Sequence, residues 1–310
     1  MKDFSANIGD IIDRSAIHAV YGGRTQPRIS PAGDARYLFL FIDPIGEEAA
    51  GCPSGMAADG CLHVAGEGLS RDQVMKSGNL SLLKHAEEGK ALHVLTKVEK
   101  GRFRYAGRFR IAPGAPFYRV DMPSETSPDV IRDGIVFRLQ PDGPVGAIPR
   151  SVLVSLPGDG TVQKTGAETL TLPDGKASRL DVALAASYAL WMARLGFDLR
   201  AMSVTPDDEY QAVKVPLYDE ASGHVYCPCA SSSRAAVRNA IGEAMDIKRV
   251  TGAGEATLLL PSEPREDVMR LVEYAGLGVD WPHDTGWHLS SRLSGGPSTV
   301  GARDLRGSQM

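Results

Sequence analysis

The sequence predicts two domains, an α+β N-terminal half whose short strands form a small β-barrel and a C-terminal α/β layer domain. The chain has 310 residues, which is enough for two domains of ordinary size. Its first half holds several short β-rich runs bounded by Gly and Pro, whereas its second half alternates helical and strand-like segments. Hydrophobic residues make up 43% and charged residues 23% of the chain, as in soluble globular proteins.

The sequence shows no membrane-spanning or secretory segment. No apolar run reaches the ~18 residues that a membrane-spanning helix needs. The first residues, MKDFSANIGDIIDR, carry acids early and lack the apolar region of a signal peptide. We therefore expect a cytoplasmic protein with no membrane partner, whose four cysteines are free thiols or metal ligands rather than disulfides.

Five segments of the first half have the alternating, β-branched or aromatic character of strands. They are residues 36–43, 61–66, 91–99, 101–112 and 134–140. In the fourth segment, the arginines are expected on one side of their strand segments and the aromatic residues on the other. One helix is expected over 70–89, with Ser70 as its cap and Gly78-Asn79 as an interruption.

Residues 146–177 are rich in Gly, Pro and Thr and are predicted to link a first domain over 1–145 to a second over 178–284. In the second domain, helices are expected at 178–196, 233–250 and 266–276. After the first helix, residues 198–206 are left unassigned, and strand-like segments lie at 211–219, 223–231, 256–261 and 277–282. The order α-β-β-α-β-α-β predicts an α/β layer domain. The polar, Gly/Ser-rich tail over 285–310 is predicted to be disordered.

Three segments of the second domain form a recognisable pattern. They are the helix that carries Tyr188, Trp191 and Gly196, then LYDEASGHVY, and then RAAVRNAIGEAMDIKR. Over about residues 178–282 the chain resembles the PD-(D/E)XK nuclease fold that is appended to bacterial restriction-type and DNA-binding proteins.

The resemblance implies a nuclease-like domain that has lost its catalytic residues. In that fold an Asp and a Glu bind Mg²⁺, and a Lys two residues after the Glu helps to activate water. The matching positions here hold Pro216, Cys227 and Cys229, and none of these suits a hard cation. We therefore expect no catalytic residue, no cofactor and no metal in this domain.

Two alternatives for the second domain stay open. An active endonuclease could use displaced acids, namely Asp207, Asp208, Asp219 or Glu220. A zinc site could use His224, Cys227 and Cys229, with His283 or His288 folding back as the fourth ligand.

The first half carries a second pattern, in five segments. They are IGDIIDRSAIHAVYGGRTQPRIS, LFLFIDP, DGCLHVAGEG, RDQVMKSGNLSLLKHAEEGKALHVL and IVFRL. Over about residues 8–140 the chain is similar to the SRA-like branch of the PUA superfamily, the modules of methylation-dependent restriction proteins that read modified cytosine.

The resemblance implies a pocket for a base that is rotated out of the duplex. In the family, two aromatic rings sandwich the base and an acid or amide reads its Watson–Crick edge. This sequence departs from that pattern, because Cys52 and Val64 stand near the aromatic positions and Ser54 stands near the acid. The other implied pocket residues are Tyr21 and His63, which with Tyr105 are the stacking candidates, and Asp59, the nearest remaining acid. Ordinary structural roles remain the alternative: core thiols for Cys52 and Cys61, a satisfied strand histidine for His63 and a turn residue for Asp59.

The resemblance also implies which residues contact the DNA backbone. Glycines allow close approach of the backbone, and neighbouring Arg, Lys or Gln side chains reach phosphates or fill the gap that a flipped base leaves. The implied residues are Gly22, Gly23, Arg24, Gln26, Arg28, Gly66, Glu67, Gly68, Arg71, Lys76, Arg102, Arg104 and Arg108. The alternative is that these loops are merely solvated.

The sequence thus predicts a non-enzymatic reader of double-stranded DNA that carries modified cytosine, 5-methylcytosine first, in a bacterial cytoplasm and at the nucleoid when bound. A homodimer is compatible with the sequence, which does not decide the oligomeric state. The alternatives are a modification-dependent endonuclease and a protein-assembly module without specific DNA binding.

Overall fold

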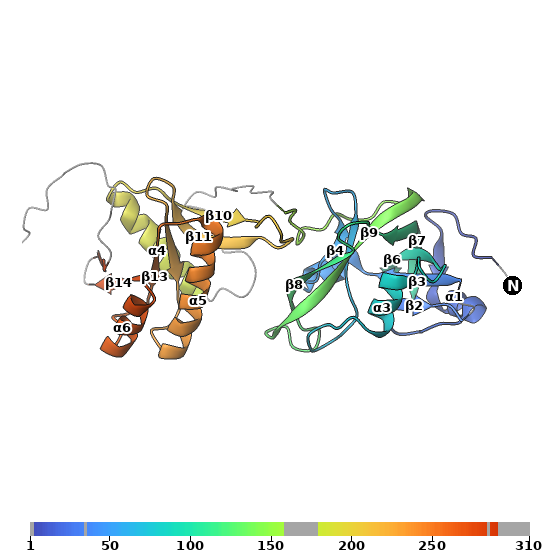
Figure 1. The fold of residues 1–310 in the computed structure, drawn as a ribbon, viewed down its shortest axis with the longest axis horizontal. Coiled ribbons are helices and arrows are strands. Elements are labelled where there is room, and N and C mark those ends of the chain that lie inside the picture. The colour runs from blue at the N-terminus through green and yellow to red at the C-terminus, as the bar shows by residue number, and fades with distance from the viewer. Residues whose placement is uncertain (1–2, 34–35, 158–178, 284–285, 291–310) are drawn as a thin grey trace, which may run out of the picture. The chain divides into compact units, whose positions relative to one another are not determined.

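The computed structural model of the protein describes residues 3–33, 36–157, 179–283 and 286–290 (Figure 1). The chain divides into two compact units. Unit 1 comprises Met1–Asp159 together with Asp207–Gln211, and unit 2 comprises Gly160–Pro206 together with Ala212–Met310. No helix among the described residues is long and apolar enough to cross a membrane.

Unit 1 is rich in strands and contains three short helices. The five strands expected from the sequence are confirmed as β3, β5, β6, β7 and β9. The elements are β1 (Ile11–Asp13), α1 (Arg14–Tyr21), β2 (Ile29–Pro31), β3 (Tyr37–Ile42), α2 (Pro44–Ala49), β4 (Ser54–Met56), β5 (Leu62–Ala65), α3 (Ser77–Lys84), β6 (Ala91–Glu99), β7 (Arg102–Ile111), β8 (Phe117–Pro123) and β9 (Ile131–Val145).

The strands of unit 1 form one sheet in the order β2-β3-β6-β7-β9-β5-β4, with β1 paired to β7 and β8 paired to β9. All pairs are antiparallel except β3 with β6. The predicted closed barrel is wrong. Among the described residues the end strands β2 and β4 do not pair, so the sheet stays open.

A bulge in β7 places the aromatic residues of this strand on both faces of the sheet. The pairing of β6 with β7 shifts between Val94 and Leu95, opposite Gly107, which has a φ of +123°. Phe103 and Tyr105 therefore pack in one apolar cluster and Phe109 in another. All three are buried, as the alternation predicted, but the extra residue reverses which face they share.

Helix α3 is much shorter than the helix expected over 70–89. Residues before Ser77 are instead held by side-chain bonds: Gln73 Nε2 donates to Gly66 O at 2.8 Å, and Asn79 Nδ2 donates to Val74 O at 3.0 Å. Gly78 and Asn79, expected to interrupt a helix, lie in the first turn of α3. The polar side chains thus compete successfully with helix formation here.

Unit 2 is a mixed sheet between helices. The predicted helices and strands are confirmed, but three strands rather than two follow the first helix. Gly286–His288, which were expected to be disordered, form a strand. The rest of the predicted disordered tail, residues 291–310, lies outside the described residues. The elements are α4 (Arg179–Arg194), β10 (Leu199–Val204), β11 (Val213–Asp219), β12 (His224–Pro228), α5 (Arg234–Thr251), β13 (Glu255–Leu259), α6 (Glu266–Tyr274), β14 (Gly278–His283) and β15 (Gly286–His288).

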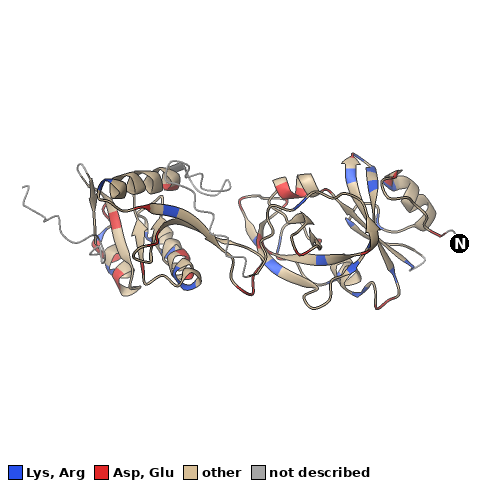
Figure 2. Cartoon of the chain, turned by 90° about the horizontal axis from the view of Figure 1, so that it is seen from above, with Lys and Arg blue, Asp and Glu red and all other residues tan. Residues whose placement is uncertain are grey.

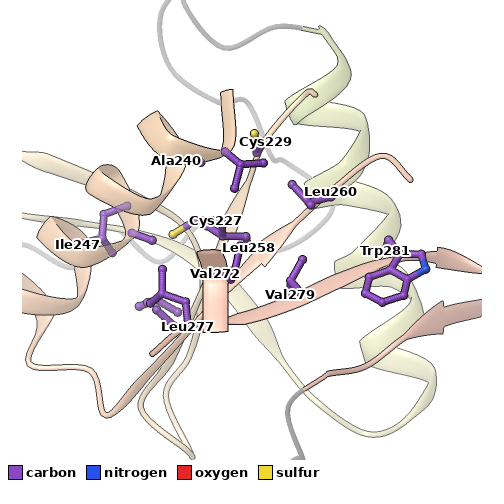
Figure 3. Packing of buried hydrophobic residues seen from close by; sticks show 14 of the residues in the cluster. Cys227, Cys229, Ala240, Ile247, Leu258, Leu260, Val272, Leu277, Val279 and Trp281 are labelled. Carbon is purple, nitrogen blue, oxygen red and sulfur yellow. The ribbon is translucent and has the colours of Figure 1, made fainter. Parts of the chain in front are cut away.

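The sheet of unit 2 has the strand order β10-β11-β12-β13-β14-β15. Strands β12, β13 and β14 are parallel, and β11 is antiparallel to both of its neighbours. Apolar residues of α5 and α6 pack on the face that holds Val225 and Cys227, whereas residues of α4 pack on the face that holds Tyr226 (Figures 1 and 3). Successive β12 residues point to opposite faces, so the two helical layers cover different residues.

Candidate functional site

A cluster of buried and half-buried charges surrounds Arg28 in unit 1. Arg28 directly precedes β2, and its carbonyl accepts a hydrogen bond from Phe41 N at 2.9 Å. Its Nη1 lies 3.5 Å from Glu47 Oε1, and its Nη2 lies 3.2 Å from Glu125 Oε1. Arg132 Nη2 lies 3.6 Å from the same Glu125 oxygen. We call these four residues the Arg28 cluster.

Helix α2 places Glu47 in the cluster. The helix begins with Pro44 at its first turn, and Asp43 accepts a hydrogen bond from Gly46 N at 3.1 Å. The next residue, Glu48, binds the backbone of the chain instead, because its Oε1 accepts from Ser54 N at 2.7 Å. Glu47 Oε1 faces Arg28 and also accepts a hydrogen bond from Asp43 N at 3.1 Å, so the start of α2 fixes the position of this oxygen.

The Arg28 cluster is incompletely paired. Two buried polar atoms of the cluster, Glu47 Oε2 and Arg132 Nη2, have no hydrogen-bond partner among the residues that the structure describes. Only 2% of the Arg132 side chain is exposed. An unsatisfied buried group costs about 1–3 kcal/mol, and more when it is charged. A carboxylate acceptor and a guanidinium donor of the cluster are therefore left without a hydrogen-bond partner within the described residues.

Cys52 adds an apolar surface beside this cluster. Its backbone N donates to Glu47 O at 2.9 Å, and its side chain packs with Ala65, Val120 and Met122. Burial raises the pKa of the Cys52 thiol, although Arg28 and Arg132 act in the opposite direction. The thiol is thus a neutral, weakly polar group next to charged ones.

Two loops that the sequence analysis singled out meet at one ion pair. Arg24, after the Gly22-Gly23 turn, places Nη1 2.8 Å from Glu67 Oε2, in the Gly66-Glu67-Gly68 turn. Glu67 N in turn donates to Asn79 Oδ1 at 2.7 Å. Arg132 Nη1 donates to Gly68 O, so the turn is fixed on the side of the Arg28 cluster.

The comparison with known families decides what unit 1 is. Residues 9–155 match the family model described as the SRA domain of ScoMcrA-like proteins. Residues 9–155 are an SRA domain of the ScoMcrA-like family. No curated protein sequence matches the chain.

Solved structures similar to the chain include restriction proteins. A structure of the sulfur binding domain and SRA domain of ScoMcrA complexed with phosphorothioated DNA is 25% identical, covers 44% of this chain and 40% of that one, and has a TM-score of 0.34. The type IV phosphorothioation-dependent restriction endonuclease ScoMcrA is 25% identical over 44% of this chain and 28% of that one, with a TM-score of 0.36. The DNA modification-dependent restriction endonuclease AspBHI is 14% identical over 85% of this chain and 83% of that one, with a TM-score of 0.32.

The SRA domain does not bring the predicted pocket residues together in one place. Cys52 lies beside the Arg28 cluster, Ser54 begins β4 with a buried hydroxyl, and Val64 is buried in the main core of the domain. Tyr21 and Tyr105 both belong to a separate aromatic cluster around Phe39.

Asp59 and His63 form a cluster of their own in the SRA domain. His63 Nε2 lies 3.1 Å from Asp59 Oδ2, and Arg138 Nη2 lies 2.8 Å from the same oxygen. His63 Nδ1 lies 2.9 Å from Tyr118 Oη, and the ring of Tyr210, which belongs to unit 1, stacks on Tyr118. The Asp59 carboxylate is thus engaged within the protein.

The pKa values of this pair follow from burial and from these contacts. Burial acts to raise the pKa of Asp59, but hydrogen bonds from Cys61 N and Arg138 outweigh it, so the pKa lies below its ordinary value. Burial lowers the pKa of His63, partly opposed by Asp59. A neutral imidazole held between an acid and a phenol is the arrangement of a satisfied structural histidine.

The predicted DNA-contacting residues of the SRA domain differ in pairing and exposure: Gly66 is buried and Glu67 half-buried, whereas Arg102 and Arg108 are both ion-paired and exposed. Arg24, Arg28, Arg102 and Arg108 form ion pairs with acids of the same domain, those of Arg102 and Arg108 being Glu99 and Asp142. Figure 2 shows that Lys and Arg positions are distributed over several strands of this domain. The predicted residues that are exposed are Gly22, Gly23, Gln26, Gly68, Arg71, Lys76, Arg102, Arg104 and Arg108.

The structure places the cysteines of the CPC segment in the apolar core of unit 2. Cys227 and Cys229 pack among Ala240, Leu258 and Leu260 beneath α5 (Figure 3). Burial raises the pKa of Cys227 to about 12. His224 lies on the opposite face, where its ring stacks on Tyr226 at 4.3 Å.

This arrangement makes the zinc alternative wrong. A histidine and two cysteines on opposite faces of one strand cannot share a metal ion. Among the residues that the structure describes, no group of three or more His, Cys, Asp or Glu side chains lies close enough to hold a metal.

Sequence reasoning missed Glu47, Glu125 and Arg132. Glu125 is 97 positions from Arg28 in the sequence, so no local spacing connects them. Glu47 had only a weak signal in the sequence. It forms an acidic pair with Glu48 shortly after Asp43-Pro44, within the short helix α2.

Proposed function

We propose that the SRA domain binds double-stranded DNA carrying a modified cytosine, 5-methylcytosine first, and rotates the base out of the duplex against the Arg28 cluster. The observation that carries the proposal is the incompletely paired, buried Arg/Glu cluster within a domain of the SRA family. Relatives support a modified-DNA ligand, since ScoMcrA is described in complex with phosphorothioated DNA and AspBHI as modification-dependent.

The unpartnered atoms of the cluster match the edge of cytosine. The exocyclic amino group of cytosine is a donor, for which Glu47 Oε2 is the acceptor. The ring nitrogen and carbonyl oxygen are acceptors, for which Arg132 Nη2 is the donor. Unstacking a base costs a few kcal/mol, which these bonds and the phosphate contacts of exposed cations offset.

Cys52 gives the proposed site a way to distinguish a methylated base. A 5-methyl group against the thiol and Ala65 would gain about 0.8 kcal/mol, the transfer energy of one buried carbon. This is less than tenfold in affinity, so strong discrimination requires a close fit around the methyl group.

We further propose that unit 2 is nuclease-like and does not cleave DNA. Its strand order, with β11 antiparallel to its neighbours, supports the resemblance over 178–282. The positions that would carry the metal ligands and the lysine hold Pro216, Cys227 and Cys229, and both cysteines are buried in the core. Of the displaced acids, Asp219 accepts hydrogen bonds from Ala221 N and Ser222 Oγ and so serves its own turn.

Titrations of the full chain with matched duplexes test the binding proposal. The duplexes carry cytosine, 5-methylcytosine, 5-hydroxymethylcytosine or a phosphorothioate at one site, at two salt concentrations. We expect a preference of about tenfold or more for a modified cytosine that persists at the higher salt, because base contacts do not depend on counterion release. Equal, salt-sensitive binding to all duplexes, or preference for the phosphorothioate alone, would overturn it.

Two variants locate the site. Glu47→Gln replaces one acceptor oxygen by a donor without changing the volume, and should lower the preference for modified cytosine about tenfold. The matched control Arg110→Gln removes an exposed cation of β7 and should leave the preference unchanged. Equal effects of the two variants would contradict the assignment of the base to the Arg28 cluster.

A cleavage assay tests the absence of nuclease activity. Methylated plasmid is incubated with the protein and Mg²⁺ or Mn²⁺, and we expect no cutting. Metal-dependent cutting that disappears in Asp219→Ala would replace this part of the proposal by an active endonuclease.

A further inference from the structure

A pocket lies in unit 1 that is lined by other residues than those of the Arg28 cluster. It has a volume of about 400 Å³ and is lined by residues 4–7 of the N-terminal segment and by Tyr37, His93, Tyr105 and Arg108. None of these residues belongs to the Arg28 cluster. Pockets of about 300–1,000 Å³ are the usual size for small-molecule ligands.

Aromatic rings form the walls of this pocket. The ring of Phe4 lies 4.6 Å from that of His93 and 5.4 Å from that of Tyr105. The ring of Tyr37 lies 5.5 Å from that of His93. At these distances the rings pack on one another and form one continuous aromatic wall, on which a planar aromatic ligand can pack by offset stacking or edge-to-face contact.

His93 offers an unused hydrogen-bonding group among these rings. Its side chain is buried, with 4% of the residue exposed, and its Nδ1 lies 2.9 Å from Tyr105 Oη. Its Nε2 has no hydrogen-bond partner within the described parts of the chain. Burial and the nearby Arg108 lower the pKa of His93 to about 4, so the imidazole is neutral near neutral pH. A neutral ring nitrogen suits the polar edge of a heteroaromatic ring better than a hydrocarbon ring.

Arg108 supplies a positive charge where the pocket meets solvent. About half of its side chain is exposed, and its Nε and Nη2 both contact Asp142 Oδ2. The contacts to Asp142 leave Nη1 as a further donor. A planar guanidinium at the rim of a small pocket is the group that best recognises a phosphate.

We propose that this pocket binds a mononucleotide, with its base packed on the aromatic wall, its polar edge toward His93 Nε2, and its phosphate at Arg108. The polar edge of a nucleobase gives His93 its missing partner, and the phosphate competes with Asp142 for the guanidinium. This site goes beyond the proposed reading of DNA, because it takes a free nucleotide at a place that the Arg28 cluster does not share.

Calorimetric titration of the full chain tests the pocket. The probes are dAMP, dGMP, dCMP and dTMP, together with the four corresponding deoxynucleosides. We expect at least one monophosphate to bind, and about tenfold more tightly than its nucleoside, because a charge-assisted contact to Arg108 is lost without the phosphate. If none of the eight compounds binds, the proposal is overturned.

Three variants assign the binding to this pocket. Arg108→Gln should lower the affinity for the monophosphate about tenfold and leave the affinity for the nucleoside unchanged. The matched substitution Arg104→Gln, at another exposed arginine of the same strand, should change neither affinity. Glu47→Gln should leave nucleotide binding intact while it reduces the preference for modified DNA. Nucleotide binding that is lost in Glu47→Gln, or that is insensitive to Arg108→Gln, would overturn the proposal.

An NMR signal tests the contact between the base and His93 without a substitution at His93. In the wild-type protein, the ring proton resonance of His93 should shift when the monophosphate that binds is added. The variant Tyr105→Phe, which lacks the hydroxyl next to His93 Nδ1, should also shift this resonance and so identify it. An unchanged His93 resonance at saturating nucleotide would show that the base lies elsewhere and would overturn the proposal.

Discussion

Arg24 Nη1 lies 2.8 Å from Glu67 Oε2, and this pair joins two turns that are distant in the sequence. The other carboxylate oxygen of Glu67 accepts a hydrogen bond from the buried Ile29 N at 2.7 Å. Gly78 lies against the same carboxylate, because a Cβ added there would collide with it. One side chain thus fixes the start of β2, the Gly66-Glu67-Gly68 turn and the first turn of α3.

Glu67→Ala should therefore destabilise unit 1. The change leaves Ile29 N without its acceptor, which costs about 1–3 kcal/mol of the free energy of unfolding. The three tryptophans, Trp191, Trp281 and Trp287, lie in unit 2, so a circular-dichroism transition that tryptophan fluorescence does not follow reports unit 1. The exposed control Glu87→Ala should change the stability by less than about 0.5 kcal/mol. A similar loss in both variants would contradict the role of Glu67.

Acidification should destabilise unit 1 through His93. Burial lowers the pKa of His93 from 6.5 to about 4. Between pH 6.5 and about pH 4 the imidazole is therefore protonated in the unfolded chain but neutral in the folded unit. The free energy of unfolding should fall as the pH is lowered, by about 2 kcal/mol between pH 7 and pH 5 from this group alone. His63 and His85 act in the same direction, because burial lowers the pKa of each.

Urea unfolding at the two pH values measures this effect. In His93→Gln the titrating group is absent, so the loss of stability on acidification should be smaller than in the wild-type protein. If the variant and the wild-type protein lose the same stability between the two pH values, the neutral burial of His93 is not the cause.

Five strands of unit 1 and the long helices could be predicted because their patterns are local, whereas β1, β2, β4 and β8 were not predicted. In β7, buried aromatic residues alternate with exposed arginines, and in α5 the residues Val237, Ala240, Ala244 and Ile247 follow helical spacing. Helices α1 and α2 were missed because each buries one residue only, Ile17 and Pro44, which gives no periodic signal. The open sheet was missed because closure depends on how distant strands pair.

The candidate site could be predicted only in part, because its charges come from separate segments. Arg28 and Cys52 were named from the sequence, but Glu47, Glu125 and Arg132 meet them only through the fold. Asp59 and His63 were assigned to the pocket by their position in a family-like segment. The structure instead pairs Asp59 with Arg138, which lies 79 positions away, and His63 with Asp59 and Tyr118.

Cys227 should be inert to thiol reagents in the folded protein. Its residue is 3% exposed, and burial raises the pKa of the thiol to about 12, so almost no thiolate forms near pH 8. Unfolding in denaturant should expose all four cysteines to reaction. Reaction of Cys227 in the native state, read by mass spectrometry of labelled peptides, would be inconsistent with a buried CPC segment.

The same burial predicts a contrast between two substitutions at Cys227. Cys227→Ser places a hydroxyl in the apolar core and should cost about 1–3 kcal/mol through the unpaired polar group. Cys227→Ala removes the sulfur without adding a polar group and serves as the matched control. Tryptophan fluorescence follows unit 2, and a serine variant as stable as the alanine variant would be the contradictory result.

Gly23 and Gly60 should respond differently to alanine, although both have positive φ, at +96° and +76°. At Gly60 an added Cβ meets no atom within 4 Å, so Gly60→Ala should cost only the backbone strain of about 1–2 kcal/mol. At Gly23 the Cβ would lie 2.6 Å from Ser30 Oγ and 2.7 Å from Pro31 O, and Ser30 Oγ is held by Arg24 N at 2.8 Å. Gly23→Ala should therefore lose about 1–3 kcal/mol more than Gly60→Ala. Equal midpoints of urea unfolding in the two variants would show that the loop before β2 can shift to accommodate a Cβ. Gly23 would then not be required for the close approach of its backbone to Ser30 and Pro31.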